Sequence, residues 1–218
     1  ASPAHPGAAM PPSPVAIDGR CFAYVFPCRW EDHCKIGFSS DPLGRIGALH
    51  RRWFEFFDLE RGALVEAESV LDARELELAL RAGLREHNAP APLAIPMQAG
   101  GHTEWFRGAE ALVAARVASL ARHGYRVHPL RGWLQAMLES RADRLHEWTL
   151  SQLGLDAQGL DGSVLEACNG DAHGAGVPVG ASAAGQRVRD ALDACAALDI
   201  ELRARLPDAV WRWYSGPE

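Results

Sequence analysis

Two short apolar segments joined by a polar turn constrain the fold of this chain more than any other feature. "CFAYVFPC" (21–28) is apolar and aromatic and closes on a proline, which is typical of a buried strand. "CKIGF" (34–38) has the composition of a second short strand, and "WEDHC" that of the turn between them. The sequence therefore predicts a β-hairpin over residues 21–38, on which the neighbouring elements must build.

A helix is predicted directly after this hairpin, in "SSDPLGRIGALHRRW". Either Ser40 or Asp41 can cap its first turn, and Pro42 suits the first helical position, where no backbone N–H is needed. The apolar residues recur at helical spacing: Leu43, Ile46 and Leu49. The pattern predicts a helix of about ten residues with Arg45 off its apolar stripe.

The segments up to residue 128 complete a mixed pattern of strands and helices. "FEFFDLE" (54–60) alternates enough for a third strand, and "TEWF" (103–106) suits an edge strand. Strong helix patterns cover 68–87 and 108–124; in the first of them the predicted core face consists of Ala73, Leu76, Leu80 and Leu84. We expect an α+β fold in which a small three-stranded sheet, mixed or antiparallel, is flanked by helices.

The C-terminal part of the sequence predicts a mainly helical accessory region. Helices are expected at 131–154 and 186–206, packed as a hairpin or against the first domain and joined by a Gly-, Ala- and Asp-rich loop at about 155–185. "VWRWY" (210–214) can dock its aromatics on the core or offer a base-stacking surface, and we favour docking. The expected domains are a flexible tail at 1–20, a first domain at 21–128 and this region at 129–218.

Composition limits the classes of function. The net charge of −6 argues against a non-specific polyanion binder, although a nucleic-acid enzyme needs only local positive charge. Residues 129–218 hold 8 basic and 13 acidic groups, so we expect them to bind phosphate poorly and to contact a protein partner or a second copy. Scattered cysteines and the lack of long apolar runs predict a reduced, cytoplasmic protein without membrane contact.

Lys35 is the only lysine in the chain; the other twenty-one basic residues are arginines. A lysine carries a compact ammonium whose pKa responds to burial, whereas arginine stays charged. GC-rich coding could explain the scarcity of lysine elsewhere, and Lys35 would then be an ordinary exposed strand residue. The alternative is that this position in the second strand requires an ammonium.

The order of these motifs resembles the GIY-YIG nuclease superfamily over residues 21–107. "FAYVF" stands at the first motif and "KIGFSSDPLGRIGAL" at the second, as in the phage and bacterial branch whose second motif begins with lysine. "ELELALRAGL" and the later "TEWF" resemble that branch's glutamate helix and closing motif. The resemblance implies a divalent-metal-dependent endonuclease, a phosphodiester hydrolase that binds DNA.

The resemblance implies a role for each of four residues. Glu77 would hold one Mg²⁺ or Mn²⁺, since one carboxylate with several waters suits such an ion. Arg45 would stabilise phosphoryl charge with its guanidinium fork. Tyr24 would orient or deprotonate the attacking water, and Lys35, on the neighbouring strand, would lower the pKa of Tyr24 or contact a phosphate.

Several alternatives remain at this point. Glu75 is the rival of Glu77 as metal ligand, although Leu80 and Leu84 follow Glu77 at helical spacing. Phe22 replaces the usual glycine of the first motif and the second motif lacks its tyrosine, which allows a catalytically inactive module that binds nucleic acid or protein. We expect the four site residues to converge in one open cleft in an enzyme, and Phe22 to fill that cleft in an inactive module.

Overall fold

The structure, a computed structural model that describes residues 20–99, 104–155 and 182–216, confirms the predicted hairpin. Strands β1 (Cys21–Pro27) and β2 (His33–Ser39) pair in antiparallel register. Tyr24 lies opposite Gly37 in this register, and Phe26 lies opposite Lys35. Tyr24 and Lys35 are thus on adjacent strands, as the sequence predicts.

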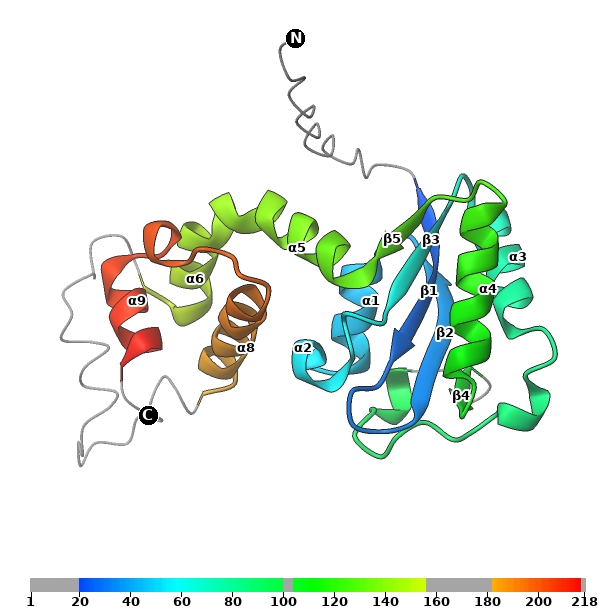
Figure 1. Ribbon diagram of the computed structural model, residues 1–218. Helices are drawn as coiled ribbons and strands as arrows, with labels where there is room; N and C mark the ends of the chain where they lie inside the picture. The colour runs from blue at the N-terminus through cyan, green and yellow to red at the C-terminus, as the bar shows by residue number, and fades with distance from the viewer. Residues whose placement is uncertain (1–19, 100–103, 156–181, 217–218) are drawn as a thin grey trace, which may run out of the picture.

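The sheet is larger than predicted. It has five antiparallel strands in the order β4-β2-β1-β3-β5, not three (Figure 1). The remaining strands are β3 (Ala63–Ala67), β4 (Trp105–Arg107) and β5 (Val127–Pro129). The predicted edge strand at "TEWF" is confirmed as β4. β5 was not predicted, because three residues are too few for a periodic pattern and the strand depends on its pairing with β3.

The third strand predicted at 54–60 is wrong. This stretch begins in a single helical turn, α2 (Trp53–Phe56), and the strand that pairs with β1 lies later, at β3. Trp53 and Phe54 are buried in the core on the α1 side of the sheet. Phe57 makes only an isolated β-bridge to Cys28. An aromatic run of this length suits a buried turn as well as a strand, so its composition did not distinguish them.

The helices of the first part follow the predicted order. Their bounds are α1 (Pro42–Leu49), α3 (Val70–Arg81) and α4 (Glu110–Arg122), with short 3₁₀ turns η1 (Arg85–His87) and η2 (Met97–Ala99). The Asp41 carboxylate accepts a hydrogen bond from the Gly44 N–H at 3.1 Å, which confirms Asp41 as the cap of α1. No described helix combines the length and apolar character needed to cross a membrane.

Helices cover both faces of the sheet (Figure 1). Alternate residues of β1 enter two separate cores, which explains why this strand is apolar throughout. On one face of the sheet, α1 and α5 (Leu130–Arg141) cover Phe22, Tyr24 and Phe26. On the other face, α3 and α4 cover Ala23 and Val25. The four residues predicted as the core face of 68–87 are all buried in the second core: Ala73, Leu76, Leu80 and Leu84.

The C-terminal helices form a third core beyond α5. The single helix predicted at 131–154 is broken by the 3₁₀ turn η3 (Ala142–Arg144), so that α6 (Leu145–Leu153) can turn onto α8 (Ala183–Ala197). The predicted helix at 186–206 ends earlier, and the turn η5 (Arg203–Arg205) leads to α9 (Asp208–Ser215). α9 docks its aromatics on this core, as predicted; most of the predicted loop lies outside the described residues.

Candidate functional site

Tyr24 and Arg45 are joined by a hydrogen bond in which Arg45 Nε donates to Tyr24 Oη at 3.1 Å. β1 directs the Tyr24 ring toward α1, where it stacks on Phe26 with 4.2 Å between ring centroids. The tyrosine is only 1% exposed, whereas Arg45, on α1, is half-buried. The half-buried side chain of Arg45 thus extends from α1 to the buried hydroxyl of Tyr24.

Gly37 makes the space for the Tyr24 ring. A Cβ atom at position 37 would lie 2.4 Å from Tyr24 Oη and 2.6 Å from Cζ, both far below contact distance. The glycine of "KIGF" is opposite Tyr24 in the register, so the ring can lie directly over the β2 backbone. The motif thus has a physical reason: its glycine lets the hydroxyl reach Arg45.

The pKa of Tyr24 is raised above its ordinary value of 10.0. Burial is the largest cause, and it outweighs the hydrogen bond and the positive charge of Arg45, both of which act to lower the pKa. The prediction that Lys35 lowers this pKa is wrong, because the cation at the hydroxyl is Arg45 and the net shift is upward. At neutral pH, Tyr24 is a phenol rather than a phenolate.

Lys35 is fully buried, which is unusual for a lysine. Its Nζ donates to Glu104 Oε2 at 2.6 Å and lies 5.4 Å from the centroid of the Trp105 ring. Burial lowers the pKa of Lys35, and the hydrogen bond and charge of Glu104 act against that shift. The ammonium therefore orients a carboxylate beside β4, and at zero exposure it does not face solvent as a phosphate contact.

Glu77 is not the surface carboxylate that the sequence suggested, since it is only 5% exposed. Its Oε1 accepts a hydrogen bond from Arg81 Nη1 at 2.6 Å, one turn later on α3. Its negative charge acts in the direction of a higher pKa at both Tyr24 and Lys35, as a small contribution beside the larger effect of burial. Glu75 is exposed and lines a groove toward α4 instead.

These contacts make one electrostatically coupled group. We call it the polar cluster, and its members are Tyr24, Lys35, Arg45, Glu77, Arg81 and Glu104. Sequence reasoning placed four of the six in the site and missed Arg81 and Glu104. Glu104 belongs to the "TEWF" segment, but its contact with Lys35 depends on the strand order that sets β4 beside β2.

The polar cluster is positively charged overall and largely buried. Its three cationic and two carboxylate side chains leave one net positive charge, which suits an anion such as a phosphate. The predicted open cleft is not present at Tyr24, Lys35 and Glu77, which are each at most 5% exposed. The members that reach the surface are Arg45, Arg81 and Glu104; the side chains of Arg81 and Glu104 are 25% and 30% exposed.

A magnesium ion could use the carboxylates of the polar cluster. The second oxygen of Glu77 has no hydrogen-bond partner among the described residues, and Mg²⁺ is bound by one or two carboxylates with several waters. The donor set therefore fits such an ion. In the described parts of the chain, no group of three or more His, Cys, Asp or Glu side chains is arranged to hold a metal.

The comparison with protein families decides which family this domain resembles. Residues 22–121 match the T5orf172 domain. The match extends from β1 through nearly all of α4 and contains every member of the polar cluster, but it leaves out β5 and the C-terminal helices. No curated protein and no solved structure shows significant similarity to the chain.

The T5orf172 match corrects the resemblance drawn from the motifs. T5orf172 is a different family from the GIY-YIG nucleases, so the prediction of that superfamily is wrong. The motifs misled because a hairpin, a glycine opposite a tyrosine and a following arginine helix are short features. They set the local packing around Tyr24 and carry little information about the family.

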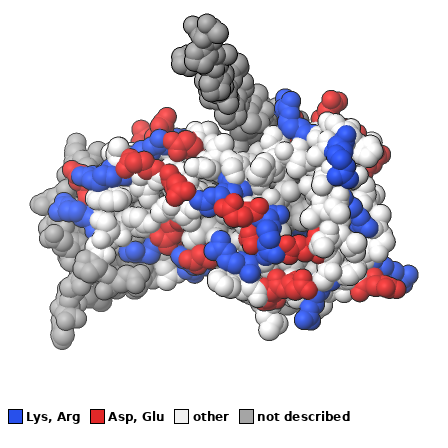
Figure 2. Space-filling view, viewed as in Figure 1, with Lys and Arg blue, Asp and Glu red and all other residues white. Residues whose placement is uncertain are grey.

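The surface outside the polar cluster carries mixed charge. On the face shown in Figure 2, arginine side chains alternate with Asp and Glu across the middle of the molecule. Many charges of the chain are paired: Arg52, which precedes α2, bonds Asp190 and Asp193 of α8 at 3.1 and 2.8 Å. This face therefore offers no continuous basic stripe for a nucleic-acid backbone, and binding must rely on local sites.

Proposed function

We propose that the T5orf172-like domain hydrolyses phosphodiester bonds in DNA and uses a divalent metal ion at Glu77. The T5orf172 domain is a nuclease-like, DNA-binding family, so the match supports a nucleic-acid-related function. The observation that carries the proposal is the hydrogen bond from Arg45 Nε to a buried tyrosine.

Arg45 is held in the geometry of a phosphate ligand. The hydrogen bond from Nε to Tyr24 orients the guanidinium, and its Nη groups form no hydrogen bond or ion pair with any described residue. Two Nη groups match two oxygens of a phosphate and keep their charge at all relevant pH values. Arg45 is the residue we expect to touch the scissile phosphate and to stabilise the charge of its transition state.

Tyr24 is a positioning residue in this proposal. Its hydroxyl is buried and accepts from Arg45, and its pKa is raised by burial, so it does not act as a base at neutral pH. This differs from the expectation that Tyr24 deprotonates a water. Tyr24 would instead fix the guanidinium of Arg45 before substrate arrives, which avoids reorganisation during the reaction.

Glu77 and Glu104 are the carboxylates available to a metal ion. Lys35 fixes one oxygen of Glu104 and Arg81 fixes one oxygen of Glu77, so both side chains are held before an ion binds. A bound Mg²⁺ or Mn²⁺ would stabilise phosphoryl charge and supply an activated water. The net positive charge of the polar cluster predicts that metal affinity is weak until a phosphate is present.

The position of Phe22 removes one argument for an inactive binding module. Phe22 would have to fill the site in an inactive module, but its ring packs edge-on against Trp133 of α5 with 5.3 Å between centroids. It also lies 6.0 Å from His128. The bulk that replaces the usual glycine is thus accommodated by α5 and does not cover Arg45.

Cleavage by an Arg45→Lys variant tests the proposal. Lysine keeps the charge but loses the Nε bond and the paired donors, so we expect cleavage of DNA with Mg²⁺ or Mn²⁺ to fall by about 10²–10³-fold. Arg122→Lys is the matched control, since Arg122 is exposed at the end of α4. Plasmid, linear and single-stranded DNA should be compared. Equal rates in both variants would contradict the assigned role of Arg45.

A further inference from the structure

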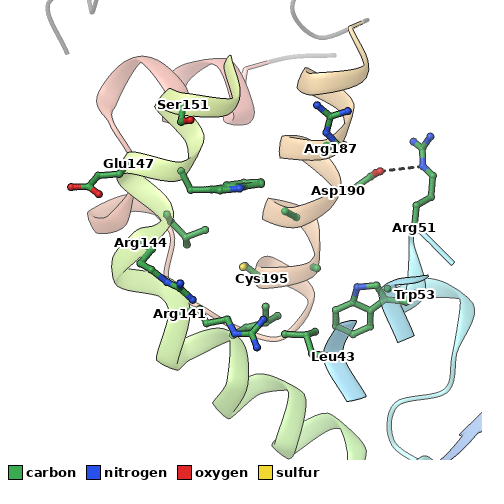
Figure 3. Close-up of a pocket in the computed structure, with 16 residues that line it drawn as sticks. Leu43, Arg51, Trp53, Arg141, Arg144, Glu147, Ser151, Arg187, Asp190 and Cys195 are labelled. Atoms are coloured by element: carbon green, nitrogen blue, oxygen red, sulfur yellow. Dashed lines mark ion pairs between the residues drawn. The ribbon is translucent and has the colours of Figure 1, made fainter. Parts of the chain in front are cut away.

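A cavity lies between the T5orf172-like domain and the C-terminal helices. It has a volume of about 850 Å³ and is lined by α1, α5, α6 and α8 (Figure 3). This volume is within the range of small-molecule sites. None of its lining residues belongs to the polar cluster.

Arginines are concentrated around this cavity. Arg141, Arg144 and Arg187 are three of the eight arginines in residues 129–218, and Arg51 joins them from the first domain. Glu147 and Asp190 are the acidic residues of the lining, so four positive charges oppose two negative ones. The expectation that the acidic C-terminal region binds phosphate poorly overlooked this local concentration.

Two of the arginines are available to a ligand. Arg51 bonds Asp190 at 3.1 Å across the edge of the cavity, as the dashed line in Figure 3 marks. Arg144 and Arg187, by contrast, are exposed and form no ion pair with any described residue. Arg144 lies at the start of α6 and Arg187 lies on α8, on opposite walls of the cavity (Figure 3).

The floor of the cavity is apolar and aromatic. Leu43, Trp53 and Ala194 are buried there, and burial raises the pKa of the Cys195 thiol to about 11, so this thiol stays uncharged. Trp148 of α6 is half-buried and also lines the cavity. An indole beside arginines is the combination on which bases stack while their phosphates are neutralised.

We propose that this cavity binds an unstacked nucleotide of a single nucleic-acid strand. The base would occupy the apolar floor beside Trp148, and the phosphates on either side of it would contact Arg144 and Arg187. An acidic peptide would use the arginines but not the aromatic floor, and inorganic phosphate would likewise leave the floor empty. The proposal rests on the nucleic-acid-related function above, and it adds a site that the polar cluster does not include.

Binding of a short labelled single-stranded oligonucleotide, measured by fluorescence anisotropy, tests this inference. The full chain is used as a Glu77→Gln parent in a chelating buffer, so that loss of cleavage cannot be mistaken for loss of binding. The test variant adds Arg144→Gln and Arg187→Gln. The control adds Arg74→Gln and Arg122→Gln, which remove two exposed arginines from α3 and α4, on the other face of the sheet.

The test pair should weaken binding by about tenfold or more, and the control pair by less than about twofold. Loss of two phosphate contacts should also reduce the slope of log affinity against log salt by about 1.4, at about 0.7 for each contact on a single strand. Trp148→Leu should cost about tenfold, and Trp148→Phe should retain most of the affinity because it keeps an aromatic face.

Competition identifies the ligand chemistry. Millimolar dAMP should displace the oligonucleotide, whereas inorganic phosphate or a polyglutamate peptide at the same concentration should not. Equal displacement by phosphate or by the peptide would overturn the proposal, because it would mean a site for anions without base recognition. Unchanged binding in the Arg144/Arg187 pair, or equal loss in the control pair, would also overturn it.

Discussion

Replacing Gly37 by alanine tests how the hairpin positions Arg45. The added Cβ would lie 2.4 Å from Tyr24 Oη and 2.6 Å from Cζ, in a core where the ring is 1% exposed and stacked on Phe26. The ring cannot stay in place, so both packing and the bond to Arg45 are disturbed. Overpacking of this kind costs about 1–3 kcal/mol in the free energy of unfolding.

For a chain of this length, that cost lowers the melting temperature by about 2–12 °C. Gly132→Ala is the control, because a Cβ on Gly132 of α5 meets nothing within 4 Å and alanine favours a helix. We expect the control to melt at the parent temperature or slightly above it. Thermal unfolding followed by circular dichroism measures both variants.

A double substitution separates the clash from any general effect of alanine in a strand. Tyr24→Phe removes the hydroxyl, which is the atom nearest the added Cβ, so Gly37→Ala should cost less in that background than in the parent. If the two effects are additive, or if Gly37→Ala melts like Gly132→Ala, the reasoning about Gly37 is refuted.

The remaining predictions concern the buried ionisable groups. Lys35→Arg should lower the free energy of unfolding, measured in urea, by about 1–3 kcal/mol and should reduce cleavage, because a larger planar group must fit a fully buried site. A variant with the parent's stability and cleavage rate would mean that this position does not require a lysine. The raised pKa of Tyr24 means that the unfolded state loses its proton first as pH rises above about 10. The free energy of unfolding should therefore decrease there, and less so in Tyr24→Phe, in pH-dependent denaturation.

The sequence predicted the elements that local signals define. The hairpin, a cap of α1 at Ser40 or Asp41 and the buried face of α3 depend on alternation, capping and helical spacing, and all three are confirmed, with Asp41 as the cap. β5 and the break at Ala142–Arg144 could not be predicted in this way. No glycine or proline marks that break, which depends on how α6 packs against α8.

The candidate site was predicted as a set of residues but not as a set of contacts. Tyr24 and Arg45 meet because Gly37 leaves room, and Lys35 meets Glu104 because β4 pairs with β2. Partner choice and burial depend on register and strand order, which composition does not specify. The expectation that Lys35 would act on Tyr24 was wrong for this reason.

Cleavage of DNA by Glu77→Gln is the most direct test of the central claim. The amide keeps the shape of the side chain and an oxygen for Arg81, but it removes the negative charge that a metal ion needs. Single-turnover cleavage with Mg²⁺ or Mn²⁺ should fall to the level seen with chelator, while the circular dichroism spectrum and DNA affinity in chelator stay at the parent values. A folded Glu77→Gln protein that cleaves DNA at the parent rate would contradict the claim that this site hydrolyses phosphodiester bonds through a metal ion at Glu77.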